Sequence, residues 1–181
     1  MNKAMRQLAA LAVSAVVISG CAAGSGPQPP IDEGPPPELR SYAVRGSADK
    51  LPLIQVEQID SRSNDGRFRI EWEVGGARAY AADLYVSEDP YPPLFSFSDA
   101  QGDVRISSLY CWVGDPDCRL RHVLNCRFDP HNVLQCDGQG AVDLTHWLGE
   151  LPRKVWLVLE ACNRQADATR CAANAVEVEF R

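Results

Sequence analysis

The strict alternation of apolar and charged residues over Arg67–Val74 limits the fold of this chain more than any other feature of its sequence. Apolar side chains occupy every second position of the segment, and charged side chains stand between them. Successive residues of an extended strand point to opposite faces, so the pattern predicts a half-buried antiparallel strand. Arg78–Val86 continues the alternation, and Gly75 and Gly76 between the two segments predict a turn.

The chain beyond residue 50 contains further short apolar or alternating segments, separated by turn residues. Only Asp143–Gly149 has helical character. It predicts a single helical turn that ends near Pro152. About seven or eight short strands with hardly any helix predict an all-β fold, an antiparallel β-sandwich. The other predicted strands are Leu53–Ile59, Val104–Val113 (with Val104, Ile106, Tyr110 and Trp112 on one face), Arg119–Cys126, Val133–Cys136, Lys154–Cys162 and Asn174–Phe180.

One stretch of the predicted sandwich has a familiar layout. The helical turn from Asp143, the Leu151-Pro152 step and the strand Val155–Cys162 together resemble the E–F crossing of fibronectin-type-III and immunoglobulin-like domains. The resemblance covers about 20 residues and implies a sandwich of this general kind. The chain lacks the Cys…Trp…Cys spacing of antibody domains, so a true immunoglobulin domain is not expected.

The N-terminal residues carry the signals of export. Lys3 and Arg6 precede the apolar run Leu8–Ile18, whose eleven residues are too few to span a bilayer as a helix. The small residues Ser19 and Gly20 end the run. A basic start, a short apolar run and small residues before a cleavage point are the layout of a secretory signal peptide.

The segment Ile18-Ser19-Gly20-Cys21 resembles the lipobox of bacterial lipoproteins, with Ile18 where leucine is commonest. The resemblance implies cleavage after Gly20, a diacylglyceryl group on the Cys21 sulfur and an acyl chain on the new amino terminus. Ala22, rather than aspartate, follows the cysteine, which in this family implies transfer to the outer membrane. Apart from these covalent lipids, no cofactor is expected.

A proline-rich segment follows the predicted lipidation site. Six of the thirteen prolines lie between Pro27 and Pro37. Proline biases a chain toward extended polyproline-II geometry, and a segment of this composition cannot bury a core. We therefore expect three parts: a cleaved signal peptide at 1–20, a lipidated cysteine and flexible tether at 21–50, and the β-sandwich domain at 51–181.

Six cysteines remain after Cys21, and an even number in an exported protein predicts three disulfides. Local pairing is favoured, because each local pair closes a plausible hairpin; each disulfide would stabilise the domain by roughly 2–3 kcal/mol. The chain lacks the Cys-x-x-Cys and closely spaced histidines that are typical of redox and zinc sites. The predicted pairs are Cys111–Cys118, Cys126–Cys136 and Cys162–Cys171.

Charge and motifs exclude several classes of function. The formal net charge is −6 without a basic block, so the chain lacks the Lys/Arg surface expected of a nucleic-acid-binding protein. It also lacks the Gly-x-Ser-x-Gly, His-Glu-x-x-His and glycine-rich phosphate-loop motifs, so we predict neither an enzyme nor a metal site. Structural or surface roles are expected for His122 and His146, and turn roles, rather than calcium binding, for Asp115, Asp117, Asp129 and Asp137.

The proline-rich loop Asp89–Phe97 holds the candidate binding residues. Its aromatic and apolar side chains could form an exposed surface for protein, peptide or sugar, or could fold back to seal the edge of the sandwich. The candidate residues are Tyr91, Leu94, Phe95 and Phe97.

These features together predict a non-catalytic adaptor, anchored by lipid to the periplasmic side of the outer membrane, that binds another envelope protein. The alternative is a module that binds carbohydrate or lipid through aromatic stacking at Tyr91 or Trp147. An enzyme with an unrecognised site is the third hypothesis.

Overall fold

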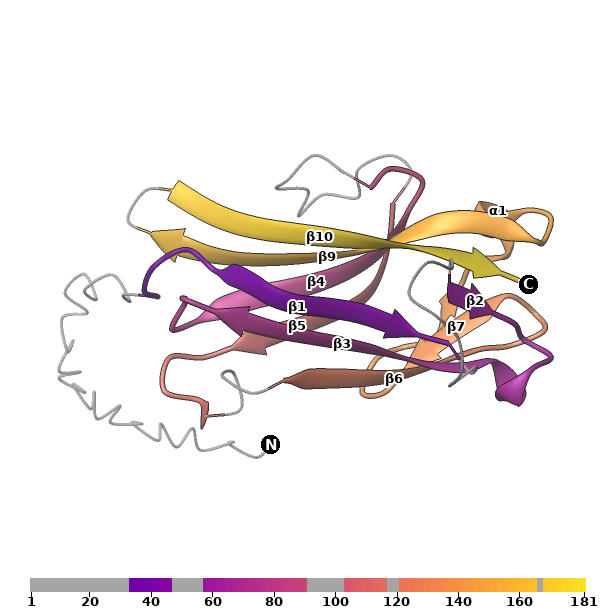
Figure 1. The fold of residues 1–181 in the computed structure, drawn as a ribbon, viewed down its shortest axis with the longest axis horizontal. Helices are drawn as coiled ribbons and strands as arrows, with labels where there is room; N and C mark the ends of the chain where they lie inside the picture. Colours follow the sequence, from indigo (N-terminus) through magenta and orange to yellow (C-terminus); the bar gives the residue numbers. More distant parts are fainter. Residues whose placement is uncertain (1–32, 47–56, 91–102, 117–120, 166–167) are drawn as a thin grey trace, which may run out of the picture. The chain divides into compact units, whose positions relative to one another are not determined.

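The alternating segments pair into two five-stranded sheets that form a β-sandwich (Figure 1). The computed structural model describes residues 33–46, 57–90, 103–116, 121–165 and 168–181. All strand pairs are antiparallel except β2 with β10. The first sheet consists, in spatial order, of β1 (Glu38–Arg45), β3 (Arg67–Gly75), β6 (His122–Phe128), β7 (Val133–Cys136) and β8 (Val142–Asp143). The second consists of β2 (Glu57–Ile59), β10 (Ala168–Phe180), β9 (Arg153–Gln165), β4 (Tyr80–Ser87) and β5 (Val104–Cys111).

The predicted all-β sandwich is therefore confirmed. Two short helical segments complete the described chain: the 3-10 turn η1 (Asn64–Gly66) and the single α-helical turn α1 (Thr145–Leu148). No helix of the described residues is long and apolar enough to cross a membrane.

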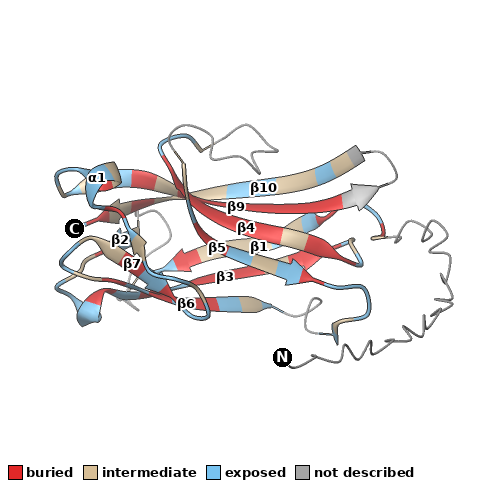
Figure 2. Cartoon of the chain, turned by 180° about the vertical axis from the view of Figure 1, so that it is seen from behind, coloured by how far each residue is buried: buried red, intermediate tan, exposed pale blue. Residues whose placement is uncertain are grey.

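The core lies between the sheets and contains the side chains of β3 and β4 that were predicted to point inward. Ile70 and Trp72 of β3 and Leu84 of β4 are each at most 4 % exposed. At one end of the core, the rings of Phe128 and Phe180 pack edge to face with centroids 4.6 Å apart. The core cluster takes side chains from both sheets, and Figure 2 shows the buried stretches of their strands.

A buried hydroxyl links the two sheets. Tyr42 on β1 donates a hydrogen bond to the carbonyl oxygen of Leu157 on β9, at 3.0 Å. Burial of this hydroxyl raises the pKa of Tyr42 well above its usual range, because the phenolate would lose its solvation.

Strand β1 lies within the segment 21–50 that the sequence assigned to the tether. The prediction of a tether extending to residue 50 is therefore wrong for Glu38–Arg45. The pairing of β1 with β3 shifts register between Leu39 and Ser41. This β-bulge breaks the period of two, so the buried side chains of β1 do not form the simple alternation that revealed β3.

The described chain is already held to the sandwich before β1 begins. The carbonyl oxygen of Glu33 accepts hydrogen bonds from the backbone N–H groups of Arg78 (2.7 Å) and Ala79 (3.2 Å). The side-chain amide of Asn163 on β9, which is 2 % exposed, donates to carbonyl oxygens of residues 33–35, the shortest to Pro35 at 2.7 Å.

A second bulge reverses the predicted faces of β5. Leu84 pairs with Ser107, but the next residue, Tyr85, pairs with Arg105, so Ile106 is an extra residue in β5. The extra residue moves the side chains that follow it to the opposite face. The prediction that Tyr110 and Trp112 point inward with Ile106 is therefore wrong: Tyr110 is 44 % and Trp112 is 63 % exposed.

The remaining strand boundaries differ at their ends. β9 and β10 each continue for thirteen residues, beyond the predicted Lys154–Cys162 and Asn174–Phe180, because they pair with each other along their whole length. β6 begins at His122 and ends at Phe128, later than the predicted Arg119–Cys126. The short strand β8 was not predicted, and the predicted helical turn is present as α1.

Two of the three predicted disulfides are present, each between residues directly opposite one another on paired strands: Cys126–Cys136 joins β6 to β7, and Cys162–Cys171 joins β9 to β10. Cys111 has a free, buried thiol, which departs from its predicted pairing. Its predicted partner Cys118 lies outside the described residues, and the predicted Cys111–Cys118 disulfide is not formed in this structure.

Candidate functional site

The outer face of the first sheet gathers arginines from three neighbouring strands. Arg67 and Arg69 occupy outward positions of β3. In the strand pairing, Arg67 lies opposite Arg127 of β6, and Arg69 lies opposite Arg45 of β1. Residues directly opposite on antiparallel strands project from the same face, so these side chains form one group.

A buried carboxylate lies at the centre of this group. Glu71 of β3 has only 8 % of its side chain exposed. Its oxygen Oε1 lies 2.9 Å from Nε of Arg69, and Oε2 lies 3.5 Å from Nε of Arg45 and 3.6 Å from Nη1 of Arg121. The three arginine side chains are each 51–56 % exposed. One carboxylate therefore orients three guanidinium groups and leaves an excess of positive charge.

A shallow pocket of about 650 Å³ opens on this face, and we call it the arginine groove. Its lining includes four arginines, four residues with side-chain amides, and the cysteines Cys126 and Cys136, whose disulfide-bonded side chains are 4 % exposed and belong to the core. The lining residues used below are Arg45, Arg67, Arg69, Arg127, Asn125, Gln135, Gln139 and Asp137.

The groove is held in shape from several sides. Nε of Arg127 donates to the carbonyl oxygen of Asp65, at 3.1 Å, and the side-chain amide of Asn125 donates to Oδ2 of Asp137, at 2.8 Å. Gly66, which leads into β3, has φ +66°, and a Cβ there would lie 1.7 Å from the carbonyl oxygen of Phe128. Glycine thus permits the close approach of this turn to β6.

A second exposed surface lies at the end of edge strand β5, and we call it the aromatic edge: Tyr110, Trp112 and Val113. The rings of Tyr110 and Trp112 pack edge to face with centroids 4.2 Å apart, and Val113 is 49 % exposed. Tyr110 lies opposite Ala81 of β4, which in turn lies opposite Cys162. The aromatic edge therefore continues toward the Cys162–Cys171 disulfide on the outer face of the second sheet.

Two carboxylates lie side by side in the middle of that outer face. Asp83 of β4 is directly opposite Glu160 of β9, and they are 6 % and 9 % exposed. Nη1 of Arg105 lies 3.8 Å from Oδ1 of Asp83. Burial, together with the negative charges of Asp83 and Glu160, raises the pKa of Tyr85 to about 12.

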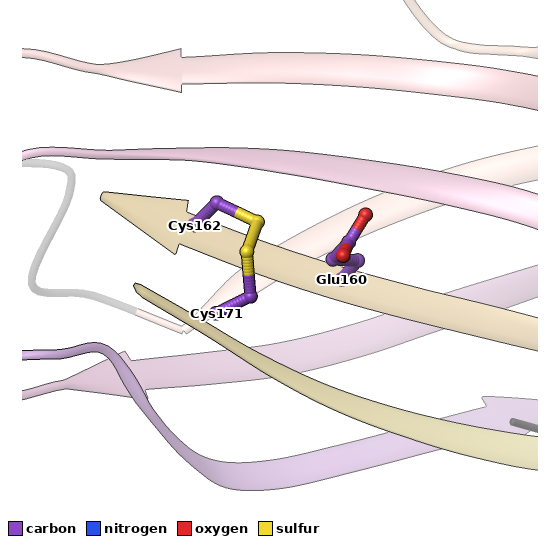
Figure 3. A group of neighbouring side chains, drawn as sticks. All are labelled: Glu160, Cys162 and Cys171. Carbon is purple, nitrogen blue, oxygen red and sulfur yellow. A yellow bond between two sulfur atoms is a disulfide. The ribbon is translucent and has the colours of Figure 1, made fainter. Parts of the chain in front are cut away.

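Glu160 also lies beside two sulfur atoms (Figure 3). Its carboxylate and the sulfurs of Cys162 and Cys171 all fall within 4.8 Å of one another. Metal binding by cysteine requires the thiolate, and these sulfurs are bonded to each other. In the disulfide form, this group offers a metal only the carboxylate of Glu160.

The histidines and aspartates singled out in the sequence occupy separate places. His122 of β6 stacks on Trp72, with ring centroids 5.2 Å apart, and its Nε2 lies 2.9 Å from the Tyr80 hydroxyl. Oδ1 of Asp129 accepts hydrogen bonds from the backbone N–H groups of His131 and Val133, the pattern of a turn residue. His146 lies in α1, exposed.

Several predicted site residues cannot be placed. Tyr91, Leu94, Phe95 and Phe97 lie outside the described residues, as do Cys21 and Asp117. Trp147, the alternative stacking residue, is partly buried and packs against the core.

Neither the arginine groove nor the aromatic edge was predicted from the sequence. Arg67 and Arg69 stood out only as the charged phase of one strand, because their neighbours come from β1 and β6, far away in sequence. Two arginines two residues apart on an outward phase were the available signal.

No protein-family model, curated protein or solved structure matches this chain.

Proposed function

We propose that this protein is a lipid-anchored lipoprotein on the periplasmic side of the bacterial outer membrane, and that its β-sandwich is a non-catalytic module that binds another envelope protein. The N-terminal sequence ending in Cys21 supports the anchor. The observation that carries the binding role is the aromatic edge.

The aromatic edge has the composition of a protein-binding surface. Aromatic side chains are enriched at the centres of such interfaces, where they supply large contact areas. Within the described residues, β5 is the last strand of the second sheet, so its outer backbone groups face away from β4. An extended segment of a partner can pair with such an edge, while its side chains contact Tyr110 and Trp112.

Site-directed photo-crosslinking in living cells tests this binding role. A photoreactive amino acid at Val113 is expected to capture one envelope protein reproducibly, and the same group at Val123 is the matched control. The control is equally exposed, at 51 %, but lies on β6 of the other sheet. Equal capture at both positions, or none above background at Val113, would contradict the role of the aromatic edge.

The purified chain separates the second candidate function from the first. The exposed ring of Trp112 is also suited to stacking on a sugar. Glycan binding by the purified chain with no other protein present, lost in Trp112→Ala, would favour a carbohydrate-binding module over an adaptor.

The anchor has its own test. Metabolic labelling with a clickable fatty acid is expected to label the full chain, and Cys21→Ser is expected to lose the label and leave the uncleaved precursor. Labelling that persists in Cys21→Ser would contradict lipidation at this residue.

A further inference from the structure

We propose that the arginine groove binds a free ligand that carries two or more phosphate groups. The groove lies on the first sheet and the aromatic edge on the second, so this site is separate from the one proposed for a partner protein.

The charge of the groove is opposite to that of the whole protein. Four arginines line it, and Asp137 is its one acidic lining residue. That carboxylate already accepts a hydrogen bond from Asn125. Within the described residues, the Arg67 side chain has neither an ion pair nor a hydrogen bond. On a chain of net charge −6, this is a local reversal that would concentrate anions at one place.

Three of the four arginines are oriented before any ligand arrives. Glu71 contacts Arg45 and Arg69 from below, and the carbonyl oxygen of Asp65 holds Arg127. Ordering a long side chain costs free energy on binding, so side chains that are already ordered bind more tightly. The Cys126–Cys136 disulfide ties together the two strands that form one wall.

The arrangement of the groups favours clustered phosphates. The planar fork of arginine donates two parallel hydrogen bonds to an oxyanion. Neighbouring strands are about 4.8 Å apart, and residues two apart on one strand are separated by about 6.7 Å. Forks spread over three strands at this spacing can each meet a different phosphate of a ligand that carries several. The amides of Gln135 and Gln139 add donors for the remaining oxygens.

The position of the groove favours a free ligand over the headgroup of the anchoring membrane. Arg45 ends β1, whereas the described chain joins the sandwich at Glu33–Pro35, beyond the start of β1 (Figure 1). Eight residues of strand place the groove about 25 Å from that end. The groove therefore lies at the end of the domain away from the point where the described chain joins the sandwich, which favours a free ligand over a lipid headgroup; only this step depends on the proposed anchor.

Calorimetric titration of the full chain, purified in a non-ionic detergent, tests the proposal. Tripolyphosphate is expected to bind saturably, at least tenfold more tightly than inorganic phosphate, and more weakly as NaCl is raised. Arg67→Gln/Arg127→Gln is expected to weaken binding at least tenfold. Arg153→Gln/Arg170→Gln removes the same charge from the second sheet and is expected to change the affinity less than twofold.

A charge-preserving variant separates the loss of the guanidinium forks from the loss of positive charge. Arg67→Lys/Arg127→Lys keeps both charges but removes the forks, and it is expected to fall between the wild type and the glutamine variant. Thermal unfolding reports whether each variant folds. Absence of saturable tripolyphosphate binding, or equal weakening in the groove and control variants, would overturn the proposal.

The source of the phosphates is tested in a second arm. A short-chain phosphatidic acid, kept below its micellar concentration, presents a lipid headgroup to the same protein. Tighter binding of this lipid than of tripolyphosphate, with the same arginine dependence, would overturn the free-ligand assignment. Photo-crosslinking at Val113 is unaffected by either outcome, so a failure here is distinguishable from a failure of the adaptor proposal.

Discussion

The outer faces of the two sheets use charge in opposite ways. On the first sheet, one buried carboxylate, Glu71, orients half-exposed arginines around an open groove. On the second, the carboxylates of Asp83 and Glu160 lie side by side, almost buried, with Arg105 at one edge. In Figure 2, β4 and β9 are buried along most of their length, whereas β6 alternates. The net charge of a chain therefore says little about which sign of charge a given face presents.

The two disulfides offer the largest effects with which to sharpen this comparison. Cys126→Ala/Cys136→Ala and Cys162→Ala/Cys171→Ala each open a loop of similar length, so each is expected to cost about 2–3 kcal/mol of unfolding free energy. Only the first pair joins two strands that line the arginine groove. Denaturant unfolding should show similar losses, and calorimetry should show weakened tripolyphosphate binding in the first variant alone. Weakening in both would mean that the groove depends on global stability.

The next largest effect is expected from the carboxylates at the centre of each outer face, Glu71 and Asp83, whose removal should change the unfolding free energy by different amounts. Glu71→Gln removes the ion pair with Arg69 and leaves the neighbouring guanidinium groups without their counter-charge, at a cost of about 1–2 kcal/mol. Asp83→Asn removes the repulsion from Glu160 and should change stability by less than about 0.5 kcal/mol. Denaturant midpoints with unchanged slopes measure both. A larger loss in Asp83→Asn than in Glu71→Gln would break the comparison.

Tyr42 tests the link between the sheets. Tyr42→Phe loses the hydrogen bond to Leu157 and is expected to destabilise the fold by about 1 kcal/mol at neutral pH. Because the pKa of Tyr42 is raised by burial, its contribution is complete below its unfolded pKa of about 10 and is lost as the pH rises above that value. The stability of the wild type should therefore fall more steeply in alkali than that of Tyr42→Phe. Parallel curves for the two proteins would contradict this account.

The smallest effect concerns Tyr85 on the second sheet. Burial is the first cause of its pKa of about 12, and the charge of Asp83 is the next. Asp83→Asn should lower this pKa, but burial should keep it above the usual value near 10. Ultraviolet absorbance of the tyrosinate follows the titration, with Tyr85→Phe to assign the signal. An unchanged pKa in Asp83→Asn would show that the acidic pair does not act on this tyrosine.

Much of the fold could be predicted from sequence, because alternation directly reports which side chains are buried. Arg67–Val74 and Arg78–Val86 correspond to β3 and β4, and local cysteine spacing identified both disulfides of the described residues. Two of the failures occur at bulges. The register shifts in β1 and β5 break the alternation, so β1 was assigned to the tether and Tyr110 to the core.

The candidate sites could not be predicted from the pattern of any one strand, because each site depends on how several strands pair. The arginine groove needs the registers Arg45 with Arg69 and Arg67 with Arg127, and these pairings join residues 24 and 60 positions apart, by difference of their numbers. The aromatic edge needs the extra residue at Ile106. Neither register nor bulge position follows from periodicity, because each is decided by tertiary pairing.

The most direct test of the central claim is to observe the arginine side chains themselves. Nitrogen–proton correlation spectra of the full chain resolve the guanidinium Nε–H groups, which can be assigned with single Arg→Lys variants. Tripolyphosphate is expected to shift the signals of Arg45, Arg67, Arg69 and Arg127 together, and to leave those of Arg105 and Arg170 on the second sheet unchanged. Shifts spread over both sheets, or no shifts at the four groove arginines, would contradict the claim that this face holds a phosphate-binding site.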